Sequence, residues 1–276
     1  MKRGKTMIKR IFSDMDGTLL NSKGKLATSN ARSIKEAGIP LTLVSARAPM
    51  EMLEAICTLE LTGPQVAFNG GLIYQMEKGH IKPLYAQAIK KDTVKELLLY
   101  LSTDFPQVSL SYYDLKHWYC DTIDQGIRYE KKLTGCQPTK LSRERFLAPQ
   151  TAIFKLMLIT FDEATMQALL SYLAKLDRSD ITYQRSGKAY LEITHHLAKK
   201  SQGIGRIMRE EQLKKRDTAA FGDGHNDLPM FEQVGYAIAM DNAMEAIKDY
   251  AHYITQSNDQ DGVSYGIKQF LQKESL

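Results

Sequence analysis

The stretch from Ile8 to Leu20, IKRIFSDMDGTLL, constrains the fold more than any other part of the chain. It begins as an apolar run typical of a buried β-strand and ends abruptly in two acids. Side chains two residues apart on an extended chain point the same way, so Asp14 and Asp16 share one face. Gly17 then lets the backbone turn, because a residue without Cβ adopts conformations closed to others. Open α/β sheets bind ligands at this end of their strands.

A second stretch near the other end of the chain repeats this pattern. The apolar run 218–221 ends in the glycine-flanked acids of GDGHND, residues 222–227. If the two strands are neighbours, four carboxylates meet and repel one another unless a cation lies among them. The donors are all oxygens, which favours Mg²⁺. The predicted metal ligands are Asp14, Asp16, Asp223 and Asp227. A DxD pair alone also fits an acidic turn or a glycosyltransferase metal motif, but the paired stretches are more specific.

The order of predicted elements indicates an α/β fold with an insertion. Short apolar strands alternate with helices in the first 70 residues and again from Lys199 onward, which predicts a parallel sheet. Between them the pattern changes to hairpins and longer strands typical of an α+β domain. We therefore predict a Rossmann-like three-layer core of residues 1–83 and 190–276, with an α+β cap domain at residues 84–189.

The composition of the chain limits the kinds of molecule that it is expected to bind. The net charge of +5 is spread along 276 residues, with no basic block that indicates nucleic acid or an anionic membrane. The three cysteines are widely spaced and suit a reducing compartment. No run of 18 apolar residues occurs, so no membrane span is predicted. We expect a cytoplasmic monomer or small homo-oligomer, and the mild positive charge is compatible with a small anionic substrate.

Two further positions complete a predicted phosphate site. Ser45 follows the second predicted strand, and the pair Lys199-Lys200 opens a helix after the insertion. A hydroxyl and a cation there would bind and neutralise phosphoryl oxygens. Taken singly, Ser45 also fits ordinary loop chemistry, and a lysine pair also fits a solvated helix face.

Together these segments resemble the haloacid dehalogenase-like superfamily of aspartate-nucleophile phosphatases. More narrowly, they resemble its Cof-type sugar-phosphate phosphatase branch, which has an α/β cap between the second and third motifs. The runs 237–243 and 258–263 resemble that branch's signature after its last motif. The chain departs from the family in having Ser45-Ala46-Arg47 for Thr-Gly-Arg and Lys200-Ser201 for Lys-Gly. His195-His196 replaces a Pro/Gly-rich turn; a substrate contact and a surface position are both open for these histidines and for His225.

The resemblance implies a role for each matching residue. Asp14 would be the nucleophile, Asp16 the general acid/base, Ser45 the second-motif hydroxyl and Lys200 the third-motif lysine. Lys200 is preferred to Lys199 by its distance from the run 191–193. Asp223 would bind the metal, supported by Asn226 and Asp227. Further predicted phosphate or substrate contacts are Gly17, Arg47, Asn69 and Asn226.

These assignments predict a Mg²⁺-dependent phosphoric monoester hydrolase whose partner is a small phosphorylated substrate, such as a sugar phosphate, and which forms an aspartyl-phosphate. A phosphomutase would use the same intermediate but pass the phosphoryl group to a second sugar phosphate. A catalytically silent module that binds phosphorylated metabolites is the alternative from another functional class. The metabolite itself cannot be read from the sequence.

Overall fold

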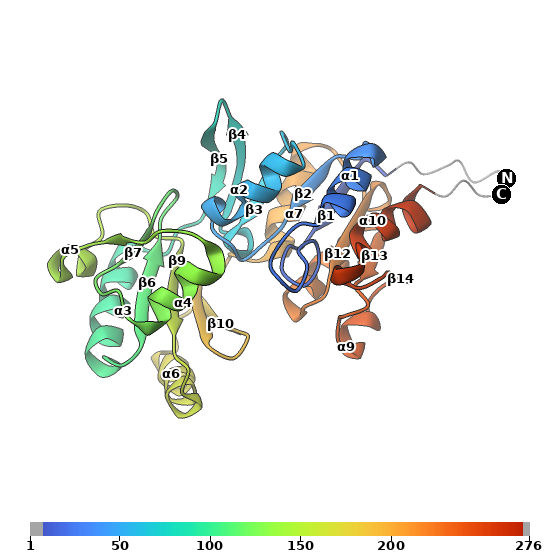
Figure 1. Cartoon of the computed structure of the whole chain (residues 1–276). Helices are drawn as coiled ribbons and strands as arrows, with labels where there is room; N and C mark the ends of the chain where they lie inside the picture. The colour runs from blue at the N-terminus through green and yellow to red at the C-terminus, as the bar shows by residue number, and fades with distance from the viewer. Residues whose placement is uncertain (1–7, 273–276) are drawn as a thin grey trace. The chain divides into compact units, whose positions relative to one another are not determined.

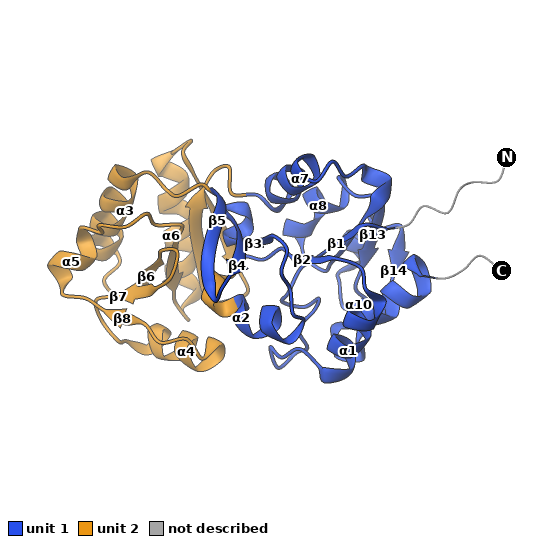
Figure 2. Ribbon diagram, turned by 90° about the horizontal axis from the view of Figure 1, so that it is seen from above, with its two compact units in different colours: residues 1–46, 52–85, 199–276 blue, residues 47–51, 86–198 orange. Residues whose placement is uncertain are grey.

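The computed structural model describes residues 8–272 and comprises two compact units (Figure 2). Unit 1 contains residues 1–46, 52–85 and 199–276, and unit 2 contains residues 47–51 and 86–198. The predicted insert of 84–189 needs correction at its far end. Strand β11 (Tyr190–His195) pairs antiparallel with β9 and β10 of unit 2, so this unit continues to Ala198. The short segment 47–51 also belongs to unit 2, which the sequence did not indicate.

Unit 1 is built on a five-stranded parallel sheet (Figure 1). In spatial order its strands are β14 (Tyr253–Ile254), β13 (Tyr236–Ala239), β12 (Thr218–Gly222), β1 (Arg10–Ser13) and β2 (Leu41–Leu43). The three middle strands are almost wholly buried, as expected for a parallel sheet covered on both faces. The predicted parallel core is confirmed.

A three-stranded antiparallel sheet adjoins β2. It consists of β3 (Gln65–Ala67), β4 (Leu72–Glu77) and β5 (His80–Ala86). A single parallel bridge between Val44 and Val66 joins β3 to the end of β2. The sequence predicted β3 as a further strand of the parallel sheet, and the structure limits that pairing to this bridge.

Helices cover both faces of the parallel sheet, which gives three layers. Figure 2 shows α7 and α8 on one side of the strands and α1 and α10 on the other. The first pair contributes Ile204, Ile207 and Phe231 to a core that contains Phe12 and Ala220. The helices of this unit are α1 (Thr28–Ala37), α2 (Pro49–Thr58), which starts within unit 2, α7 (Lys200–Glu210), α8 (Leu228–Phe231), α9 (Glu245–Lys248) and α10 (Gly262–Gly266).

The strand order creates a switch point at the centre of this sheet. From β1 the chain continues to β2 on one side, whereas β12, β13 and β14 follow one another on the other side. Ser13 is in register with Phe221, so the residues after β1 and β12 emerge side by side. In open α/β sheets the ligand binds outside the carboxyl ends of the strands at such a point. Asp14 and Asp223 follow these two strands.

Unit 2 contains a six-stranded sheet. Its order is β10 (Ile181–Ser186), β11, β9 (Lys155–Ile159), β6 (Ser109–Tyr113), β7 (Trp118–Cys120) and β8 (Thr139–Lys140). Its neighbours are antiparallel except β7 and β8. The sequence missed β8 and helix α5 (Arg143–Leu147), both only a few residues long.

One face of the six-stranded sheet forms the core of unit 2. Helices α3 (Lys91–Asp104) and α6 (Glu163–Leu176) pack there through residues such as Leu97, Leu101 and Leu169. The Asp162 side chain caps α6 by accepting a hydrogen bond from the Thr165 amide. Helix α4 (Gln125–Thr134) contacts the other face, where its Gly126 lies against Ser109 of β6. Among residues 8–272, no helix has both the length and the apolar composition needed to span a bilayer.

Candidate active site

Asp14 is fixed at the end of β1 by the sheet itself. Its amide donates a hydrogen bond to the Phe221 carbonyl of β12 at 3.0 Å, which extends the parallel ladder by one residue. The backbone therefore cannot move independently of β12. The side chain is buried at the carboxyl edge of the sheet, where the switch point lies. The structure thus places the predicted nucleophile at the position that an α/β sheet uses for its ligand.

Lys200 links Asp14 to Asp227. Its Nζ donates to Asp14 Oδ1 at 2.6 Å and to Asp227 Oδ1 at 2.7 Å, and the residue is 2% exposed. Lys200 is the first residue of α7, and the backbone before it touches the loop after β3. A Cβ on Gly70 would lie 2.3 Å from the Lys199 carbonyl oxygen, so this close approach requires glycine. The geometry agrees with the choice of Lys200 over Lys199.

The loop after β12 is shaped by the Asp227 side chain. Asp227 Oδ2 accepts hydrogen bonds from the amides of Asp223 and Gly224, each at 3.0 Å. One carboxylate oxygen therefore holds the loop while the other binds the ammonium of Lys200. This arrangement makes Asp227 a positioning residue for both Asp223 and Lys200.

Gly17 and Asp223 lie so close together that a side chain at position 17 would displace the Asp223 carboxylate and strain the backbone. Gly17 has a φ of +75°, and a Cβ there would lie 2.3 Å from Asp223 Oδ2. Thr18 Oγ1 donates to Asp223 Oδ1 at 2.8 Å, and Asn242 Nδ2 donates to the Gly17 carbonyl at 2.8 Å. The turn after β1 and the loop after β12 are therefore joined by direct contacts at the predicted site.

Three carboxylates form a group that could hold a metal ion. Oxygen atoms of Asp14, Asp223 and Asp227 lie within 4.8 Å of one another. Asp14 and Asp223 each use one oxygen in a protein hydrogen bond and have a second to offer an ion. The all-oxygen donor set suits a hard cation such as Mg²⁺. The prediction that Asp16 adds its side chain to this group is not supported, because Asp16 is exposed and is not a member of the group.

Burial and mutual repulsion raise the pKa values of the acids. The pKa of Asp14 is raised well above its ordinary value, mainly by burial, with further increases from Asp227 and Asp223 against the opposing effect of Lys200. Burial also raises the pKa of Asp223 to about 6, although the Thr18 hydrogen bond lowers it. For Lys200, burial alone would lower the pKa, but the two carboxylates that it contacts raise it. A divalent cation among these acids would stabilise their ionised forms.

Three loops bring the remaining predicted phosphate contacts together. Ser45 is buried after β2, and its amide donates to the Val66 carbonyl at 3.0 Å. The Asn69 amide donates to the Ser45 carbonyl at 2.8 Å, and Asn69 adopts a left-handed φ of +54°. Asn226 Nδ2 lies 3.5 Å from Asn69 Oδ1. Ser45, Asn69 and Asn226 therefore form a connected set in unit 1.

Arg47 lies in unit 2, and so do His195 at the end of β11 and His196 in the turn after it. Arg47 belongs to unit 2, where its Nη1 donates to the Glu51 carbonyl at 3.2 Å. His195 is buried, with its Nε2 3.0 Å from Gln87 Nε2, and its ring lies against that of His196. The surface position considered for His195 is therefore wrong. His225 is exposed in the single-turn helix 225–227.

Two residues of the site were not predicted as functional. Thr18 contacts Asp223, and Asn242 contacts Gly17. Both residues lie within the sequence motifs on which the family resemblance is based, so the sequence did contain a sign of their importance. The contacts themselves join positions more than 200 residues apart, which a local pattern cannot reveal.

Comparison with known proteins agrees with this geometry. The sequence profile of the haloacid dehalogenase-like hydrolases matches residues 11–267. The chain belongs to this family. The hydrolase is similar to two Bacillus subtilis proteins, 5-amino-6-(5-phospho-D-ribitylamino)uracil phosphatase YwtE and phosphatase YwpJ. The first is 29% identical over 96% of this chain and 98% of its own, and the second is 26% identical over 96% and 100%.

Solved structures confirm the fold of the hydrolase. A haloacid dehalogenase-like hydrolase from Bacteroides thetaiotaomicron is 27% identical with a TM-score of 0.86, covering 95% of this chain and 99% of its own. A protein from Thermotoga maritima at 24% identity has a TM-score of 0.85, covering 97% and 99%. The family resemblance and the fold class predicted from the motifs are therefore confirmed.

Proposed function

We propose that this hydrolase is a Mg²⁺-dependent phosphatase that cleaves small phosphorylated metabolites through an aspartyl-phosphate on Asp14. The observation that carries the proposal is the buried Lys200 ammonium, 2.6 Å from Asp14 and 2.7 Å from Asp227, beside the Asp223 carboxylate. A nucleophilic carboxylate, a fixed cation and a second acid that could hold a metal are the elements that phosphoryl transfer needs. Similar proteins with phosphatase names support the same reaction class.

The chain's own residues account for each step. Asp14 attacks phosphorus, forming an oxygen–phosphorus bond while the bond to the leaving oxygen breaks. Asp16 gives its proton to that oxygen. Water then attacks the phosphorus of the aspartyl-phosphate and gives a proton back to Asp16, which frees the Asp14 carboxylate and inorganic phosphate.

Binding and charge neutralisation come from the residues around Asp14. Lys200 and the Ser45 hydroxyl would bind phosphoryl oxygens and reduce repulsion with the incoming phosphate. Asp14 and Asp223 would hold Mg²⁺, with Asp227 keeping Asp223 and Lys200 in place. When bound, the ion supplies positive charge that neutralises the phosphoryl oxygens during transfer.

The test replaces the nucleophile while keeping its shape. Asp14→Asn should lower turnover of p-nitrophenyl phosphate by about a thousandfold or more, as loss of the nucleophile does in other covalent enzymes. Asp249→Asn, an exposed position in the same unit, is the matched control and should keep full activity. Mass spectrometry of the acid-quenched wild-type protein should find phosphate on the peptide containing Asp14. Equal turnover in the two variants would refute the assignment.

The same assay separates the alternatives. A phosphomutase would need a bisphosphate activator, whereas the proposed phosphatase releases inorganic phosphate without one. A silent binding module would show no hydrolysis of any ester while one phosphorylated ligand raised its Tm.

A further inference from the structure

The sequence runs 237–243 and 258–263 resemble family motifs, but the proposed mechanism gives neither of them a role. The first run includes the end of β13 at Ala239 and the loop after it, and the second lies in the loop after β14, which ends at Ile254. Both strands run parallel to β12 and β1. The loops after them therefore emerge at the carboxyl edge of the sheet, where Asp14 also lies.

Asn242, in the first of these loops, is hydrogen-bonded to both the turn after β1 and the second loop. Its Nδ2 donates to the Gly17 carbonyl at 2.8 Å, and its Oδ1 accepts a hydrogen bond from the Asn258 amide at 2.9 Å. Asn258 Nδ2 in turn donates to the Leu20 carbonyl at 2.9 Å. The two loops from the end of the chain therefore hold two carbonyl groups of a turn near its beginning.

Asp259 adds a contact at the far end of this turn. Its Oδ1 accepts a hydrogen bond from the Ser22 amide at 2.8 Å. Asn242, Asn258 and Asp259 are called the clamp below. The clamp therefore binds three backbone groups of the turn at residues 17–22, one near its start, one in its middle and one at its end.

The internal hydrogen bonds of the turn hold its first peptide groups only weakly. The Leu20 amide donates to the Met15 carbonyl at 2.8 Å, and the Thr18 amide donates to the same carbonyl at 3.3 Å, which is long for such a bond. A peptide group is planar, so the bond from Asn242 to the Gly17 carbonyl also fixes the direction of the Thr18 amide. Asn242 therefore orients the peptide group that the turn itself holds least firmly.

This peptide group directly follows the proposed general acid/base. Asp16 is exposed, so its position depends on the backbone of the turn more than on packing of its side chain. Thr18, on the other side of Gly17, donates to Asp223 Oδ1 at 2.8 Å. A proton donor must lie within hydrogen-bond reach of the reacting oxygen, and a displacement of about 1 Å can reduce the rate about a hundredfold. The orientation of the turn is therefore a condition for catalysis.

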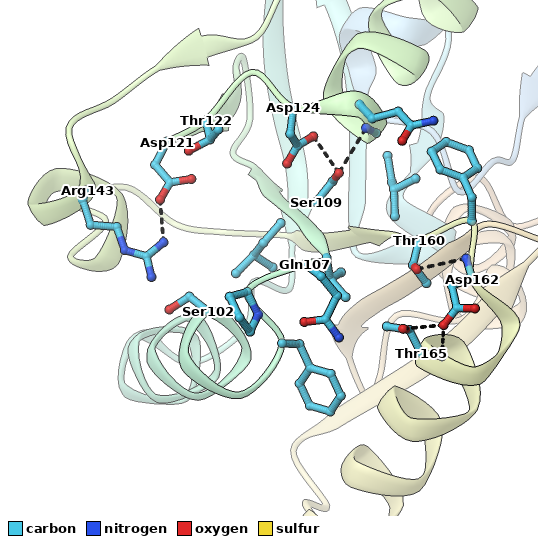
Figure 3. A pocket seen from close by; sticks show the side chains of 18 residues that line it. Ser102, Gln107, Ser109, Asp121, Thr122, Asp124, Arg143, Thr160, Asp162 and Thr165 are labelled. Carbon is cyan, nitrogen blue, oxygen red and sulfur yellow. Dashed lines mark hydrogen bonds and ion pairs between the residues drawn. The ribbon is translucent and has the colours of Figure 1, made fainter.

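Polar side chains that serve only the local fold make a different kind of contact. A pocket of unit 2, with a volume of about 520 Å³, is lined by two such residues, Asp124 and Asp162 (Figure 3). They accept hydrogen bonds from the amides of Ile127 and Thr165, each three residues later at the start of a helix. Asn242 instead binds a carbonyl 225 positions away in the chain. Its bond therefore stabilises the turn after β1 and not an element of its own loop.

We propose that Asn242 is a positioning residue for Asp16 and that the clamp fixes the turn in which this acid lies. The inference rests on the proposed phosphatase function and gives the two sequence runs a role in it. Asn242 acts through the Gly17 carbonyl and does not touch the substrate. Without it the peptide group can rotate, and Asp16 then reaches the leaving oxygen less often. The nucleophile stays in place, because the β1–β12 ladder holds its backbone.

The test compares two aryl esters that differ in their need for an acid. p-Nitrophenolate is a stable anion that leaves without a proton, whereas the phenolate released from phenyl phosphate gains more from protonation. In Asn242→Ala the ratio of kcat/KM for phenyl phosphate to that for p-nitrophenyl phosphate should fall at least about tenfold. A variant that merely folds less well loses both activities equally and keeps the ratio. An unchanged ratio in Asn242→Ala overturns the inference.

A control and a second variant exclude general effects on the loop. Asp241→Ala is the control, because Asp241 is exposed in the same loop and its Oδ1 lies 3.7 Å from Lys248 Nζ. It should keep the wild-type ratio, and an equal fall there overturns the inference. Asn242→Asp keeps an acceptor for the Asn258 amide but has no N–H for the Gly17 carbonyl, so the ratio should fall as in Asn242→Ala. A wild-type ratio in Asn242→Asp overturns the inference even if the alanine variant does not fold.

Asp16→Asn separates failure of this inference from failure of the proposed function. It should lower the same ratio, and adding Asn242→Ala should lower it no further, because Asn242 acts through Asp16. A further fall in the double variant overturns the inference alone. If the unmodified protein hydrolyses neither ester, or if Asp16→Asn keeps the wild-type ratio, the proposed mechanism fails and the inference fails with it.

Discussion

Replacing Glu130 by glutamine should change the pH dependence of stability in a calculable way. Burial, with a further contribution from Glu51, raises the pKa of Glu130 from its ordinary 4.5 to about 7 in the folded protein. Below pH 4.5 the group is protonated in both states and costs nothing. Between about pH 4.5 and 7 the unfolded chain ionises while the folded protein keeps the proton, so stability falls as pH rises. Above about pH 7 the loss is constant.

The magnitude follows from the two pKa values. At about 1.4 kcal/mol per pKa unit, the rise from 4.5 to about 7 corresponds to about 3 kcal/mol. Glu130→Gln has no proton to lose, and its amide oxygen can still accept the hydrogen bond from Tyr190. The free energy of unfolding of the variant, minus that of the wild type, should therefore increase by about 3 kcal/mol from pH 4 to pH 8.

The assay uses the single tryptophan of the chain. Trp118 is buried in unit 2, so its fluorescence during urea denaturation reports on the unit that contains Glu130. This matters because two units can unfold in separate transitions. Glu144→Gln on the surface of the same unit is the control and should give a difference independent of pH. A constant or decreasing difference for Glu130→Gln would show that its charge is not held in a desolvated site.

Three further predictions concern the candidate active site in unit 1. Gly17→Ala should lower activity more than tenfold and stability by about 1–3 kcal/mol. Gly24 has a similar φ of +71° but open space around it, so Gly24→Ala should lose stability only. Equal activities of the two variants would contradict the close-contact argument. Lys200→Met should reduce kcat at least about a hundredfold and destabilise the Mg²⁺-free protein by about 3–5 kcal/mol. Lys199→Met is the control, and similar kinetics and urea midpoints for the two variants would refute the role of Lys200. Increasing concentrations of Mg²⁺ should raise Tm, by an amount equivalent to about 2.7 kcal/mol of stability at a hundred times Kd, and EDTA should reverse this rise. An equal rise of Tm in Asp223→Asn would rule out the carboxylate site.

The residues of the candidate site could be located from the sequence because parallel sheets obey a simple geometric rule. Apolar runs identify strands, and the residues that follow them gather at one edge once the strands are neighbours. Asp14, Ser45 and Asp223 were found in this way, and the family resemblance supplied Lys200. Asp16 lies outside the group formed by Asp14, Asp223 and Asp227, because it belongs to the turn that follows β1 and not to the extended strand.

The second unit was less predictable for a different reason. The predicted boundary at residue 190 assigned β11 to unit 1, but antiparallel pairing with β9 and β10 keeps this strand in unit 2. The ion pair between Lys155 and Glu192 was not predicted either, because it joins residues of separate strands that no local sequence pattern relates.

The pairing of β1 with β12 has a consequence for protein synthesis. Arg10 is opposite Thr218, so the first strand must wait for about 200 residues before its neighbour leaves the ribosome. All of unit 2 is synthesised within that interval, and domains generally fold as units during translation. The inserted unit therefore completes its sheet while Ile11 and Phe12 are still without one of their final neighbours. We therefore expect the apolar residues of β1 to remain without this neighbour until β12 has been synthesised.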